Sequence, residues 1–130
     1  MNRQECAEMF AERLPDGKSI YADHMEIFGE VLIHILVGEM INYPLTALLK
    51  DDTDKDGIKL YCDVIEEMWR KGDVDVVNAM EVSVLESPTY DPAIWQRFGT
   101  YIPKDFRWHI NDKSIPNNLH YLNAAKLKGE

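Results

Sequence analysis

Apolar residues cover most of the circumference of the segment Asp23–Asn42, and this feature constrains the fold more than any other in the sequence. At about 100° per residue, a helix over this segment is apolar on one broad side, and Glu26, Glu30 and His34 line a narrow remaining stripe. Other elements must surround such a helix, so we expect it to be the central helix of the core. Its longest apolar stretch, Val31–Ile41, is much shorter than the ~18 residues that a membrane-spanning helix requires.

The rest of the chain shows the same helical spacing, interrupted by short stops of proline, glycine and aspartate. Pro44 lacks a backbone N–H, so it is expected to kink or end the central helix. No segment alternates convincingly between apolar and polar residues, although the valines of 74–86 leave a strand open there. The expected helices cover residues 3–14, 23–42, 45–50, 58–71, 74–86, 93–98, 103–111 and 119–127.

These patterns predict an all-α protein. The chain has 130 residues, of which 45% are hydrophobic and 28% charged, which suits one compact domain with a single core. We expect one helical domain over residues 1–130, built as an irregular bundle or a short stack of α-hairpins with about six to seven helices.

The charge balance is strongly acidic and uneven. With 14 Lys and Arg against 23 Asp and Glu, the formal net charge is −9, which would repel a nucleic-acid backbone. Residues 1–90 carry a net charge of −11, whereas residues 91–130 carry +2. A protein partner with a basic surface is therefore expected to meet the first two thirds of the chain.

The two cysteines, Cys6 and Cys62, lie far apart in the sequence, and both fall on apolar faces of expected helices. A thiol in such a place is more often a small core residue than a nucleophile. The first residues lack the basic start and apolar run of a signal peptide. We therefore expect a cytoplasmic protein that binds no membrane. Because the sequence has no nucleotide-binding or catalytic motif, we also expect no cofactor and no enzymatic activity.

The segment Asp52-x-Asp54-x-Asp56-Gly57 matches the first half of a calcium-binding loop, in which alternate carboxylates converge on the cation. The second half departs from that pattern, because the position of the bidentate glutamate holds the shorter Asp63. Helical spacing from residue 58 onward also starts before the loop would deliver its last ligand. We interpret the segment as a solvated turn in which Asp54 or Asp56 caps the next helix, and calcium binding stays open as an alternative.

Glu26, Glu30 and His34 would lie one turn apart on one face of the expected central helix, as metal ligands do in helical di-metal proteins. Such sites need matching ligands on other helices, and His109 and His120 lie in regions without Glu-x-x-His spacing. We interpret this stripe as the exposed edge of a buried helix, with a metal-dependent sensor or enzyme as the alternative.

The last third of the chain is rich in aromatic residues interleaved with basic ones, a composition that is typical of protein interfaces. The same rings could instead close the core against the central helix, which is the interpretation that we favour. An exposed subset would mark a contact surface and support a helical adaptor or a homo-oligomer. The residues concerned are Trp95, Phe98, Tyr101, Phe106, Trp108, His109 and Tyr121, with Arg97, Lys104 and Arg107 among them.

Three segments, Glu30–Met40, Val76–Glu86 and Phe98–Pro103, resemble small uncharacterised bacterial helical proteins, some of which resemble immunity proteins of polymorphic or contact-dependent toxin systems. The resemblance covers roughly residues 25–110 and consists mainly of core patterning. It implies a cytoplasmic protein without catalytic activity that binds and neutralises a cognate toxin domain, for example a basic nuclease. We expect the acidic groups between helices to bind that partner, namely Asp51, Asp52, Asp54, Asp56, Asp73 and Asp75.

Overall fold

The computed structural model describes residues 1–85 and 91–112, and every regular element in these ranges is helical. The elements are α1 (Arg3–Arg13), α2 (Gly17–Phe28), α3 (Ile33–Val37), η1 (Gly38–Asn42), α4 (Tyr43–Asp51), α5 (Lys55–Lys71), α6 (Val74–Ala79), η2 (Met80–Val84), α8 (Pro92–Gly99) and α9 (Lys104–Asp112). Here η marks a π-helical segment. Because α3, η1 and α4 form one continuous helix, as do α6 and η2, the described residues make seven helical segments. The all-α prediction is confirmed, and 74–84 is helical.

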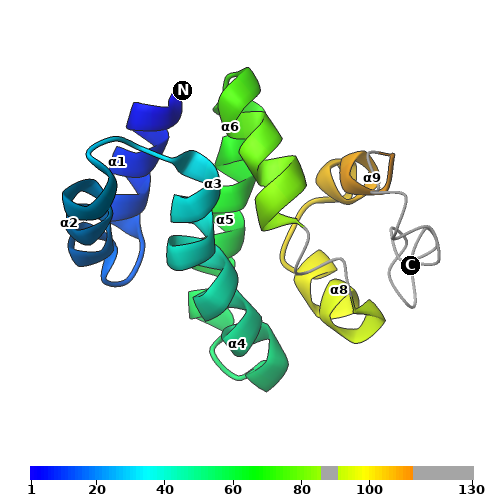
Figure 1. The fold of residues 1–130 in the computed structure, drawn as a ribbon. Helices are drawn as coiled ribbons and strands as arrows, with labels where there is room; N and C mark the ends of the chain where they lie inside the picture. Colours follow the sequence, from blue (N-terminus) through cyan, green and yellow to red (C-terminus); the bar gives the residue numbers. More distant parts are fainter. Residues whose placement is uncertain (86–90, 113–130) are drawn as a thin grey trace.

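Helix α5 lies in the middle of the molecule and contacts α1, α4, α6 and η2. The α1–α2 hairpin forms one edge, and α8 and α9 lie at the opposite edge (Figure 1). The amphipathic sequence of α5 explains this place, since its apolar residues recur at helical spacing and all face inward. Its buried side chains are Ile58, Tyr61, Cys62, Val64, Ile65 and Met68.

The expected single helix over 23–42 is wrong, because the chain leaves the helical conformation between α2 and α3. Gly29 has a φ of 72° and ends α2, with its N–H donating to the carbonyl of Met25 at 2.8 Å. Glycine adopts this left-handed conformation without a steric penalty. The next helix restarts at Ile33 after the extended residue Leu32. The first six residues of the expected central helix, 23–28, thus belong to the outer hairpin.

Pro44 neither ends nor interrupts the helix that contains it. The helix changes to π spacing in η1, where the N–H of Tyr43 donates to the carbonyl of Gly38 five residues earlier, and then continues as α4. A proline ring would crowd the carbonyl four residues before it in a regular α-helix. The wider π turn before Pro44 changes that spacing, which explains how the helix continues.

Four helix starts expected from the sequence are confirmed by their capping hydrogen bonds. Asn2 accepts from the N–H of Glu5 at 2.8 Å, and Asp91 accepts from the N–H of Ala93 at 2.8 Å. Asp54 and Asp73 cap α5 and α6 in the same way. These caps satisfy backbone donors that the first turn of a helix leaves without a partner.

Most of the aromatic residues of α8 and α9 belong to the core, as we favoured. Trp95, Phe98 and Phe106 are buried, and Arg107 is buried with them, donating to the carbonyls of Gly99 and Ile102 at 3.1 and 3.0 Å. Trp108 is the exception at 44% exposure. The expected helix over 119–127 and Tyr121 lie outside the described residues.

Cys6 and Cys62 are fully buried, as expected of core thiols. Burial raises the pKa of the Cys6 thiol to about 12, and it raises the pKa of Cys62 as well. In the unfolded chain both thiols ionise near pH 8.5. Above that pH the unfolded state loses protons that the native state keeps, so stability present at neutral pH is lost as the pH rises.

We expect the free energy of unfolding to fall by about 1.4 kcal/mol per pH unit for each thiol between pH 9 and pH 11. Urea unfolding under reducing conditions at pH 8, 9.5 and 10.5 measures this slope. The Cys6→Ala variant removes one of the two thiols, and its slope is expected to be shallower by that amount. Equal pH slopes of the unfolding free energy for the wild type and the variant would contradict a raised pKa of the Cys6 thiol.

Candidate protein-binding surface

The acidic turn between α4 and α5 is held together by its own contacts. Asp52 ends α4 with a φ of 53°, and its Oδ1 accepts from Lys55 Nζ at 2.8 Å and from the Tyr101 hydroxyl at 3.2 Å. The hydrogen bond from Lys55 is the main reason that the pKa of the Asp52 carboxyl lies below its ordinary value. Asp51 accepts from the Thr53 hydroxyl. This turn is therefore a structural connection whose negative charge is partly compensated.

The calcium alternative finds no geometric support in this turn. Asp54 Oδ1 accepts from the N–H of Gly57 at 2.9 Å, so this carboxylate caps α5 as we expected. Asp56 already lies in the first turn of that helix. Within residues 1–85 and 91–112, no group of three or more His, Cys, Asp or Glu side chains could hold a metal ion. The interpretation as a capping turn is confirmed at Asp54.

The second predicted corner lies far from the first. Asp73 accepts from the N–H of Val76 at 3.1 Å, and Asp75 lies 4.0 Å from Arg3 in an exposed pair. The two corners flank α5, whose 17 residues span about 25 Å, and Figure 1 shows them at its opposite ends. The six predicted aspartates therefore form two separate places on the molecule.

The metal stripe expected from Glu26, Glu30 and His34 does not form, because α2 ends before Glu30 and His34 belongs to α3. His34 instead approaches Ser83 of η2, with Nδ1 2.6 Å from Oγ. Asn42 of η1 donates to the Ser83 carbonyl at 2.9 Å, so η2 is joined both to α3 and to η1.

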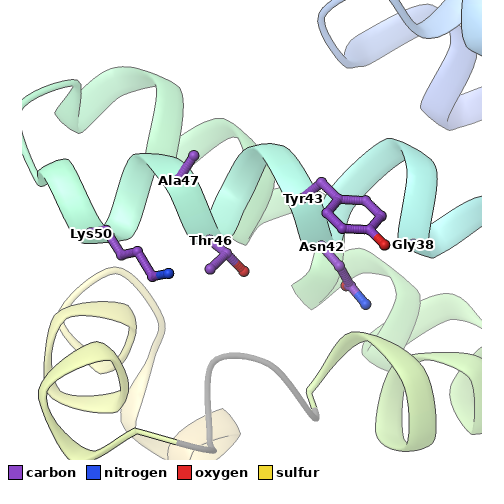
Figure 2. A pocket seen from close by; sticks show the side chains of 6 residues that line it. All are labelled: Gly38, Asn42, Tyr43, Thr46, Ala47 and Lys50. Carbon is purple, nitrogen blue, oxygen red and sulfur yellow. The ribbon is translucent and has the colours of Figure 1, made fainter.

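A pocket of about 510 Å³ lies along one face of η1 and α4, next to this junction. Figure 2 shows that its six labelled residues all come from this one helix, with the side chains of Asn42 and Lys50 extending to the same side of it. The lining residues are Gly38, Asn42, Tyr43, Thr46, Ala47 and Lys50.

Three of the four acidic residues of α5, all of them half-buried, pair with neighbouring bases, and the exposed Asp56 forms no ion pair within the described residues. Lys59 pairs with Asp63 at 2.6 Å, and Arg70 pairs with Glu66 at 2.6 Å. Glu67 pairs with Lys71 at 2.9 Å and also with Arg13. The hydrogen bond from Lys71 and the charge of Arg13 lower the pKa of Glu67. This face carries many charges but little net charge.

Among the described residues, the α1–α2 hairpin carries the largest group of carboxylates without an ion pair. Residues 3–30 contain seven acidic and three basic residues, a net charge of −4. All seven carboxylates are exposed, and none forms an ion pair within the part of the chain that the structure describes. The two arginines of α1 pair with Asp75 and Glu67 outside the hairpin. The seven are Glu5, Glu8, Glu12, Asp16, Asp23, Glu26 and Glu30.

The end of this hairpin combines acidic and apolar groups. Ile27 is 71% exposed and Phe28 is 38% exposed at the last turn of α2. Asp23 and Glu26 precede them on the same helix, and Glu30 follows one residue after Gly29. We call these five residues, Asp23, Glu26, Ile27, Phe28 and Glu30, the α2 tip.

Our sequence reasoning did not select the α2 tip. It assigned these residues to a buried helix, because the apolar run continues across Gly29. The glycine itself is the signal that could have placed a helix end there.

Comparison with known proteins identifies the family. A family model described as "Domain of unknown function (DUF7674)" matches residues 7–114. The chain belongs to this family. No curated protein and no solved structure matches it. The matched range of the DUF7674 domain contains nearly all of the helices described above, and in the described residues no helix is long and apolar enough to cross a membrane.

Proposed function

We propose that this chain is a non-enzymatic binding protein of the immunity type, which binds a basic toxin domain and blocks its activity. The observation that carries the proposal is the α1–α2 hairpin, with seven exposed carboxylates that have no basic partner in the described residues. Three of the four acidic residues of α5 pair with bases, so the hairpin holds the larger share of the carboxylates that have no ion pair in the described residues. A basic partner would supply the missing counter-charges.

Opposite charge mainly accelerates association. A surface of one sign raises the rate at which an oppositely charged protein is encountered, and dissolved salt screens that attraction over about 10 Å at 0.1 M. Charges at the rim of an interface act mostly on the association rate, whereas buried contacts act on dissociation. A cytoplasmic inhibitor of a toxic enzyme benefits from fast capture, which fits the acidic hairpin.

The test is co-expression in a bacterial host with the domain that is encoded immediately upstream of this chain. We expect that domain alone to stop growth, and the pair to restore growth and to purify as a one-to-one complex. The association rate constant is expected to fall at least tenfold between about 20 mM and 500 mM salt. An association rate constant that does not change with salt concentration would overturn the proposal. An upstream domain that neither stops growth nor binds this chain would overturn it as well.

The six aspartates between helices enter this proposal as part of the acidic field. Asp54 and Asp73 must be changed to asparagine in such tests, because asparagine caps a helix about as well as aspartate. Alanine at these positions would remove a cap worth about 1 kcal/mol and confound binding with stability.

A further inference from the structure

The α2 tip exposes apolar surface in a place that the fold holds rigid. His24 lies within the same last turns of α2 and is fully buried, and its Nε2 accepts from the N–H of Leu32 at 3.0 Å. The rings of His24 and Phe28 are 4.8 Å apart. Gly29 ends the helix one residue later. An exposed isoleucine on so fixed a helix end loses little conformational freedom on binding, which favours affinity.

The charges around the α2 tip decide what can cover it. Asp23, Glu26 and Glu30 surround Ile27 along the chain, and none of them has an ion-pair partner in the described residues. A second copy of this chain would bring two such acidic rims together, and like charges across an interface cost free energy. The surface that fits is an apolar hollow whose rim carries lysine or arginine side chains.

Another exposed apolar residue shows why the α2 tip is distinctive. Val74 is 84% exposed and lies between Asp73 and Asp75. Both carboxylates already have partners within the chain, since Asp73 caps α6 and Asp75 pairs with Arg3. Val74 therefore has no free acidic rim, and it offers a matched control for Ile27.

We propose that the α2 tip is the anchor of the inhibitory complex: Ile27 enters an apolar pocket of a basic protein partner, and Asp23, Glu26 and Glu30 pair with lysine or arginine side chains around that pocket. This inference rests on the proposed function and deepens it. The two parts of the α2 tip act on different rates: the desolvated apolar anchor sets the dissociation rate, and the acidic rim sets the association rate.

The experiment uses the full chain and the inactivated upstream-encoded domain as the probe, with binding kinetics as the readout. Ile27→Ser is expected to raise the dissociation rate constant at least 30-fold with little change in association. The control Val74→Ser changes a more exposed residue and is expected to leave both constants within about twofold.

Two charge variants complete the test. Asp23→Asn, Glu26→Gln and Glu30→Gln together are expected to slow association at least fivefold. The matched triple Glu5→Gln, Glu8→Gln and Glu12→Gln removes the same charge from α1, keeps a side chain that suits the capping box, and is expected to have less than half of that effect on a logarithmic scale.

The outcomes separate the two proposals. A wild-type complex that forms and inhibits, but that Ile27→Ser leaves at the wild-type dissociation rate, would overturn the anchor while the proposed function stands. Equal effects of the two triples would likewise show that overall charge, and not the α2 tip, directs binding. A wild-type chain that forms no complex would overturn both.

Discussion

Replacing His24 by alanine is expected to lower the free energy of unfolding by about 3–5 kcal/mol. His24 is fully buried, so its removal leaves a cavity between α2 and the following helix. It also accepts the N–H of Leu32 at 3.0 Å, and that donor would lose its partner. The second ring nitrogen, Nδ1, lies 3.2 Å from Glu39 Oε1, which orients the ring. One side chain thus fills space and holds the break between α2 and α3.

The measurement is equilibrium urea unfolding of the purified variant, followed by circular dichroism. His34→Ala is the matched control, because His34 is exposed and its contact with Ser83 is expected to contribute no more than about 1 kcal/mol. Amide hydrogen exchange on His24→Ala is expected to speed up first at residues 29–32. Equal losses of stability in the two variants would refute the assigned role of His24.

Replacing Gly17 by alanine is expected to cost about 1–3 kcal/mol. A Cβ atom at Gly17 would lie 2.4 Å from the carbonyl oxygen of Phe10 and 2.8 Å from that of Ala11, which is closer than van der Waals contact allows. Both obstacles are backbone atoms of α1, so no side-chain rotation relieves them. The α1–α2 hairpin must open for alanine to fit.

Gly38→Ala is the control for this substitution and is expected to change stability in the opposite direction. A Cβ at Gly38 meets nothing within 4 Å, and the residue has the ordinary helical φ of −61°. Alanine is the better helix former there by about 0.5–1 kcal/mol. Thermal unfolding of both variants tests the pair, and destabilisation by both would show that the close approach at Gly17 is not the cause.

The local patterns of the sequence predicted much of the fold, because they depend on residues close along the chain. The amphipathic spacing of α5 is an example, since six inward-facing apolar residues suffice to define a buried face. The caps at Asn2, Asp54, Asp73 and Asp91 are others, because each carboxylate or amide bonds an N–H two or three residues ahead. Where a feature needed only one turn of helix, the sequence was enough to predict it.

The helix end at Gly29 could not be predicted from local patterns. Glycine inside an apolar run is compatible with either a continuous helix or a helix end, and the choice depends on whether another group satisfies the backbone after it. Here the ring of His24 bonds Leu32 across eight residues, and α3 packs beside α1 and α6. The sequence shows the glycine but not the partner, so the central helix was misplaced.

The candidate binding surface, too, was predicted only in part from the sequence. The sequence by itself determined the helical class, the buried thiols and the acidic excess of the first two thirds, since composition and spacing decide these. Only the tertiary structure decided which charges remain free. The pairing of Arg3 with Asp75 and of Arg13 with Glu67 joins residues more than 50 positions apart, and it leaves the carboxylates of the α1–α2 hairpin without a basic partner in the described residues. Coulomb energy depends on distance in space, which the order of residues along a chain does not give.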